Sequence, residues 1–164
     1  MILWDTFDKN EISLLIMNGA AYLAIWLLPN KLPRDIALVS LVWGFSIGIL
    51  FDFTLGGGLM DFYRENDSNH YDLFDLVYYF LFAPFGYAFI YFYEFLKISR
   101  KTFIWYVITW SFIGIGAQWV FTWLDIIILQ KGYKLAYSLP VFLIIQTTTG
   151  LYYNLVKSRY PQSN

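Results

Sequence analysis

The chain has 164 residues, of which 59% are hydrophobic, 23% are aromatic and 14% are charged, and its formal net charge is −1. Soluble domains contain about 45–50% apolar and about 25% charged residues, so this composition predicts a membrane protein, with one domain over residues 1–164. The absence of cysteine excludes disulfides and thiolate metal sites, and the lack of a basic excess argues against nucleic-acid binding.

Five apolar segments are long enough to cross a bilayer, which takes about 20 residues of helix. We expect these helices at residues 12–28, 36–55, 73–96, 103–129 and 135–156. Pro29 follows the first segment and Pro33 precedes the second. Pro84 and Gly86 predict a kink within the third. The sequence therefore predicts an all-α fold, a polytopic membrane helix bundle with five transmembrane helices.

The distribution of lysine and arginine predicts the orientation, because cytoplasmic loops carry an excess of these residues. Four of them, Lys9, Arg64, Lys131 and Lys134, lie on the side of the N-terminus, and seven lie on the opposite side. We therefore expect the N-terminus and an acidic loop at residues 57–72 outside, and the C-terminus in the cytoplasm. The first residues lack the basic region of a signal peptide, so the first helix is expected to remain as an anchor.

Small residues occupy every fourth position of the second predicted helix, at Ser40, Gly44 and Gly48, and Asp52 follows on the same face. Residues four apart share a helix face, and small residues allow membrane helices to approach each other closely. The pattern predicts a helix-packing face with Asp52 tucked into the bundle. A ligand-binding role for Asp52 is the alternative.

Two further aspartates are expected at the membrane depth of Asp52. Asp75 falls in the first turn of the third helix, and Asp125 lies near the outer end of the fourth, with Gln118 and Thr122 below it on one face. The commoner role of the fourth-helix residues is interhelical hydrogen bonding, and that of Asp75 is interaction with the positive end of its helix dipole. A site for a cation or ligand is the alternative. Clustered carboxylates repel one another, so at least one of the three should hold a proton or share a cation, which is either Arg64 as a structural counter-ion or an exchangeable solute or metal ion.

Motifs for phosphate binding, dinucleotide binding, zinc proteolysis and nucleophilic catalysis are absent from the sequence. His70, the sole histidine, lies in the acidic loop, where an ordinary exposed loop residue is favoured over a metal ligand. We therefore expect no cofactor and no metal, and an enzymatic function is disfavoured.

Several short stretches occur in a recognisable order: Leu28-Pro29 ahead of the helix with Asp52, Asp61-Phe62-Tyr63 in the loop, Trp110-Ser111 with Gln118-Trp119, and Lys134-Leu135-Ala136-Tyr137-Ser138. In this order they resemble a family of small, uncharacterised multi-pass membrane proteins of endospore-forming bacteria. The resemblance covers roughly residues 28–153. It implies a multi-pass protein of the bacterial cytoplasmic membrane and implies no activity.

Three functions are consistent with these features. The first is a binding or regulatory module, or a subunit of a membrane assembly, because the chain is small and lacks catalytic motifs. The alternative is a small transporter, channel or substrate-capture subunit that uses the outward acidic cluster for a cation or cationic solute. An enzyme with Asp52 and Asp125 as an acid–base pair ranks last. The expected partners are the lipid bilayer and either another membrane protein or further copies of the chain.

Overall fold

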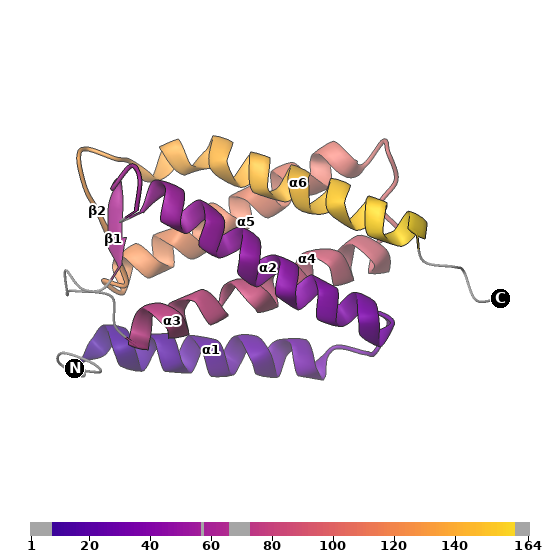
Figure 1. Cartoon of the computed structure of the whole chain (residues 1–164), viewed down its shortest axis with the longest axis horizontal. Helices are drawn as coiled ribbons and strands as arrows, with labels where there is room; N and C mark the ends of the chain where they lie inside the picture. The colour runs from indigo at the N-terminus through magenta and orange to yellow at the C-terminus, as the bar shows by residue number, and fades with distance from the viewer. Residues whose placement is uncertain (1–7, 57, 66–72, 160–164) are drawn as a thin grey trace.

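The computed structural model describes residues 8–56, 58–65 and 73–159, and it is a bundle of helices with a small sheet at one end (Figure 1). The helices are α1 (Lys9–Leu27), α2 (Arg34–Leu55), α3 (Leu73–Phe80), α4 (Phe82–Phe95), α5 (Phe103–Trp123) and α6 (Ser138–Arg159). A 3-10 turn, η1 (Leu135–Tyr137), leads into α6, and the strands are β1 (Tyr63–Glu65) and β2 (Ile127–Leu129). We call the end with β1 and β2 the sheet end and the opposite end, where α4 meets α5, the far end.

Within the described residues, five helices are long and apolar enough to cross a membrane: α1, α2, α3 with α4, α5, and η1 with α6. The five candidate spans are thus helical, as the sequence predicts, and their length and apolarity indicate a membrane protein. The observed helices begin earlier than expected at α1 and α2, and α6 continues to Arg159. The early start of α1 follows from a capping box, in which Asp8 accepts from the amide of Asn10 at 3.2 Å and Glu11 accepts from the amide of Asp8 at 2.9 Å.

The third predicted span is interrupted ahead of Pro84, and it forms two helices, α3 and α4, that meet at Leu81. Proline has no N–H group, so Pro84 cannot bond to the carbonyl of Phe80 four residues earlier. The amide of Leu81 bonds to the carbonyl of Tyr78 at 3.0 Å, three residues earlier, which frees the carbonyl of Val77 from the regular helical pattern. The interruption therefore releases two carbonyl groups inside the apolar part of the bundle.

Helix α1 supplies the partners for both of these carbonyl groups. The hydroxyl of Tyr22 donates to the carbonyl of Phe80 at 3.1 Å, and the side-chain amide of Asn18 donates to the carbonyl of Val77 at 3.0 Å. Leu14, one turn before Asn18, is fully buried against the same part of the bundle. Unpaired carbonyl groups are costly in an apolar environment. The two hydrogen bonds from α1 remove this cost, so α1 is held by polar contacts at the interruption between α3 and α4.

Helices α2 and α4 pack with their backbones almost in contact. A Cβ atom added to Gly44 would lie 2.6 Å from the carbonyl oxygen of Phe82 and 2.8 Å from the Cα atom of Gly86. Gly48 faces the ring of Phe82, and Ser40 is buried one turn before Gly44. The predicted packing face of α2 is therefore the face that lies against α4, and no larger side chain fits there.

The fourth predicted helix is wrong at its end, because α5 stops at Trp123 and residues 124–129 leave the helix. A Schellman motif terminates it: the amide of Ile126 donates to the carbonyl of Phe121 at 2.9 Å, and that of Asp125 donates to Thr122 at 3.3 Å. Asp125 has a φ of 61°, in the left-handed region that aspartate tolerates better than most residues. Asp125 thus ends a helix instead of extending it.

Residues 127–129 then form β2, which pairs antiparallel with β1 so that Tyr63 lies opposite Leu129 and Glu65 lies opposite Ile127. Residues 126–129 are three isoleucines and a leucine, and β-branched residues favour a strand once a partner strand is present. The sheet fixes β1 across the ends of α2 and α5. Part of the expected acidic loop is therefore ordered against the bundle.

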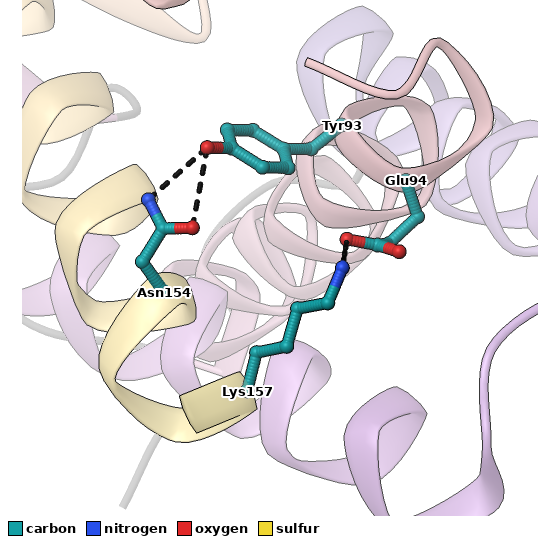
Figure 2. A network of polar contacts seen from close by, with 4 residues as sticks. All are labelled: Tyr93, Glu94, Asn154 and Lys157. Atoms are coloured by element: carbon teal, nitrogen blue, oxygen red, sulfur yellow. Dashed lines mark hydrogen bonds and ion pairs between the residues drawn. The ribbon is translucent and has the colours of Figure 1, made fainter. Parts of the chain in front are cut away.

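At the far end, polar contacts join α4 to α6 (Figure 2). The hydroxyl of Tyr93 donates to Asn154 Oδ1 at 3.3 Å, and Asn154 Nδ2 lies 3.1 Å from the same hydroxyl oxygen. Lys157 Nζ forms an ion pair with Glu94 Oε1 at 2.6 Å. Helices α5 and α6 also pack directly on each other, where Gly114 faces the ring of Phe142. The bundle therefore contains two close helix pairs, α2 with α4 and α5 with α6.

Candidate ligand-binding cavity

A cavity of about 140 Å³ lies between the α2/α4 pair and the α5/α6 pair. Its wall is mostly apolar and aromatic. The polar side chains in the wall are those of Asp52, Tyr63, Tyr78, Gln118, Tyr133, Ser138, Gln146 and Thr149. A cavity of about 150 Å³ lined by apolar side chains can hold benzene, so this one has room for a ligand of similar size.

The cavity exists because small residues line it while aromatic residues hold its walls apart. Gly48, Gly114 and Ala117 contribute little volume to the wall. Trp43 of α2 spans the gap to α6, where its indole N–H donates to the hydroxyl of Thr149 at 3.0 Å. The same indole stacks on Tyr152 with the ring centroids 3.7 Å apart. These contacts join α2 to α6 through large side chains, in contrast to the backbone contact between α2 and α4.

Asp52 lies at the sheet end of the cavity and is only 3% exposed. Its Oδ1 atom accepts from the hydroxyl of Tyr63 at 2.7 Å and from the hydroxyl of Tyr78 at 3.4 Å. Tyr63 comes from β1 and Tyr78 from α3, so two other elements converge on the carboxylate at the end of α2. Hydrogen bonds to a charged acceptor are stronger than neutral ones and offset part of the cost of burying the carboxylate.

Glu65 forms a carboxyl pair with Asp52. It lies two residues after Tyr63 in β1, and alternate residues of a strand project to the same side. Burial, the hydrogen bond to the side chain of Asp52, and the charges of Asp52 and Asp75 raise the pKa of Glu65 far above that of an ordinary carboxyl. Glu65 is therefore the protonated member of the pair at neutral pH and donates to Asp52.

The structure separates the predicted site residues. Asp52 and Gln118 line the cavity. Asp75 is buried in the first turn of α3 and acts on Glu65 through its charge. The hydroxyl of Thr122 donates to the backbone carbonyl of Gln118 at 2.9 Å. Asp125 is exposed in the turn after α5 and takes no part in a cluster with Asp52, because the left-handed conformation turns the chain away there.

Gln118 is the polar residue of the cavity whose hydrogen bonding is incomplete. Its side chain is 7% exposed, and its Oε1 atom is buried without a hydrogen-bond partner among the residues that the structure describes. It lies on the face of α5 that includes Gly114 and Phe121, and all three line the cavity. An acceptor is therefore available inside the cavity for a ligand that can donate a hydrogen bond.

Sequence reasoning missed Glu65, Tyr63 and Tyr78 as neighbours of Asp52. The signal present in the sequence was the alternation of Tyr63 and Glu65, but three residues are too few to predict a strand. His70 and the other residues of 66–72 lie outside the described part of the chain. Within the described residues, no group of three or more histidine and acidic side chains is arranged to hold a metal ion.

Comparisons of the chain with protein-family models, with curated proteins and with solved structures find no match. The resemblance to a membrane-protein family of endospore-forming bacteria therefore stays a prediction. A helical bundle by itself supports many functions, so the cavity and the groups in its wall are the features that bear on function.

Proposed function

We propose that this chain is a membrane-embedded binding module that takes a small organic solute into the cavity between its two helix pairs. The observation that carries the proposal is the buried Oε1 atom of Gln118, which lines the cavity without a hydrogen-bond partner in the described part of the chain. Leaving such an atom unpaired costs about 1–3 kcal/mol, and a ligand that donates to it removes this cost. A mostly apolar pocket with a few convergent polar groups is the usual form of a small-molecule site.

The cavity supports solute binding over the other two functions considered from the sequence. A purely structural subunit has no need for a cavity between α2 and α6, which Trp43 joins through its side chain. An acid–base pair of Asp52 and Asp125 has no support, because Asp125 is exposed outside the cavity. Delivery of the solute to another membrane protein, or to further copies of the chain, is part of this proposal as a capture subunit.

Cavity filling tests the proposal. In Ala117→Phe the new ring occupies about the volume of a small aromatic ligand, and in the control Ile113→Phe the ring replaces an exposed side chain of the same helix. Small aromatic probes such as toluene and benzyl alcohol are expected to raise the melting temperature of the purified wild type and of the control. Saturation at 100 times Kd adds about 2.7 kcal/mol of stability. Equal stabilisation of Ala117→Phe, or none in any variant, contradicts the proposal.

We further propose that the sheet end faces the outside of a bacterial cytoplasmic membrane, so that solute enters from that side. The seven cations of the other side support this orientation: Lys31, Arg34, Lys97, Arg100, Lys101, Lys157 and Arg159. Since the chain has no cysteine, Ala136→Cys at the sheet end and Ser99→Cys at the far end provide single labelling sites. An impermeant thiol reagent should label Ala136→Cys and not Ser99→Cys in intact cells. The reverse pattern overturns the orientation.

A further inference from the structure

We infer that the ligand of this cavity is a small organic monocation, a primary ammonium on a compact aromatic or aliphatic body, held by Asp52 and Gln118. This inference rests on the proposed function of the cavity and adds the chemical class of the ligand. Two independent observations carry it: the buried carboxyl group of Asp52 in the wall, held by two tyrosine hydroxyl groups, and the unpaired acceptor of Gln118.

The charge of the site follows from the pairing of Asp52 with Glu65. With Glu65 protonated, the formal charges of Asp52, Asp75 and Arg64 add up to one negative charge. The titratable and charged groups around the pair are Asp75, Tyr78 and Tyr79 of α3, Tyr63 and Arg64 of β1, and Tyr133 before η1. Ile127 of β2, opposite Glu65, brings no charge. A buried carboxylate is stabilised by a cation of equal charge, which selects monocations over anions and over neutral molecules.

The acceptors in the wall select the head group of the ligand. Asp52 presents a carboxylate and Gln118 an amide oxygen, and both line the cavity. A primary ammonium has three N–H donors and no acceptor, so it can donate to more than one acceptor of the wall. An alcohol has a single donor, and a carboxylate ligand has none. A primary ammonium can therefore donate more hydrogen bonds to acceptors of the wall than an alcohol or a carboxylate can.

The rest of the wall selects the body of the ligand. Aromatic rings of Phe82, Trp110, Phe121 and Phe142 line the cavity, and such rings favour both apolar contact and a nearby cation. Hard metal ions are usually held by several carboxylates, and within the described residues no three acidic or histidine side chains are grouped to hold one, which favours an organic cation. The volume of about 140 Å³ limits the body to about one six-membered ring.

Glu65 is a positioning residue in this arrangement. Its carboxyl group donates to Asp52, and with the hydroxyl groups of Tyr63 and Tyr78 it holds that carboxylate in place. Glutamine has the same shape as a protonated glutamate and can also donate a hydrogen bond. Glu65→Gln should therefore keep the preference for a monocation, whereas an ionised Glu65 would make the same substitution weaken cation binding.

The experiment compares benzylammonium, benzyl alcohol, benzoate and toluene at neutral pH on the purified full chain, by calorimetry or by thermal stability. The wild type should bind benzylammonium at least about tenfold more tightly than benzyl alcohol, which is the contribution of one charged hydrogen bond. Asp52→Asn should abolish this preference and still bind toluene, which shows that the cavity is intact. Glu65→Gln should retain it.

Gln118→Met provides a second variant of similar size, and it should weaken benzylammonium binding about tenfold without weakening toluene binding. Equal affinity of the wild type for benzylammonium and benzyl alcohol, or an unchanged preference in Asp52→Asn, overturns the inference and leaves the cavity proposal standing. Binding of no probe at all overturns the proposed function and this inference together.

Discussion

Glu94 at the far end of the bundle and Asp52 at the sheet end are both acidic, but their carboxyl groups are stabilised by different means. At the far end Glu94 pairs with Lys157 at 2.6 Å, and these side chains are 29% and 48% exposed (Figure 2). At the sheet end Asp52 is almost fully buried and is held by two tyrosine hydroxyl groups and by Glu65. Water screens the exposed ion pair of Glu94 and Lys157, whereas the carboxyl group of Asp52 lies in an apolar environment.

This difference shows where the chain can respond to a ligand. Glu94 already has a basic partner in Lys157, and neither side chain lines the cavity. At the sheet end the carboxylate lines a cavity together with an unpaired amide oxygen, Gln118 Oε1, in the described part of the bundle. Removing groups at each end should therefore affect stability and binding in distinguishable ways.

The largest effect is expected from Gly44→Leu, which breaks the α2/α4 contact that supports both ends. A Cβ atom at this position already lies too close to the backbone of α4, so stability should fall by about 3 kcal/mol or more. Gly19→Leu is the control, because nothing lies within 4 Å of a Cβ atom added to Gly19. Thermal or chemical unfolding in detergent measures both variants. A similar loss in the two would show that α2 tolerates a side chain toward α4.

The next effect compares the same substitution at the two ends. Tyr63→Phe removes a hydrogen bond to the carboxylate of Asp52, which should cost about 1.5–3 kcal/mol. Tyr93→Phe removes a hydrogen bond to the neutral amide of Asn154, which should cost about 0.5–1.5 kcal/mol. Unfolding free energies of the two variants test the comparison. If Tyr93→Phe is the more damaging, the buried carboxylate does not depend on Tyr63.

The titration of Glu65 is expected to change the free energy of unfolding by a smaller amount per pH unit. Its pKa in the folded protein is raised above the ordinary value of 4.5, chiefly by burial and by Asp52. The contribution of this group to stability is therefore fully present below pH 4.5 and is lost as the pH rises toward the raised pKa. The slope is at most about 1.4 kcal/mol per pH unit.

Glu65→Gln removes this titration, so its stability should depend less on pH than that of the wild type across the neutral and alkaline range. Unfolding measured at a series of pH values provides the comparison. Parallel curves for the two proteins would mean that Glu65 is ionised in the folded state. Glu94→Gln, at the exposed far end, is the control for general effects of removing a carboxylate.

The smallest effect is expected from Lys157→Met, which removes the ion pair of the far end and keeps most of the apolar stem. Exposed ion pairs contribute about 0–1 kcal/mol, and salt screens that contribution. The stability difference between this variant and the wild type should shrink as salt is added. A loss as large as that of Tyr63→Phe would mean that the two ends do not differ as described.

The sequence by itself determined the spans and the interruption of the third one. Length and apolarity are local properties, so five long apolar helices were predicted from them, and five helices long and apolar enough to cross a membrane are present within the described residues. The missing N–H of Pro84 likewise acts on its own helix, and the third span is interrupted one turn before it. The spacing of Ser40, Gly44 and Gly48 determined which face of α2 has only small side chains and can pack closely, whichever helix lies against it.

Only the tertiary structure decided which acidic side chains lie next to one another. Residues 127–129 suit a helix or a strand equally by composition, and pairing with β1 made them a strand. That pairing carries Tyr63 and Glu65 over the end of α2 to Asp52, while the helix termination at Asp125 takes the third expected carboxylate out to the surface. The cavity likewise lies where α2 contacts α4 through its backbone and α6 through large side chains. Such contacts join residues far apart in the chain, such as Trp43 with Thr149, and no local pattern encodes them.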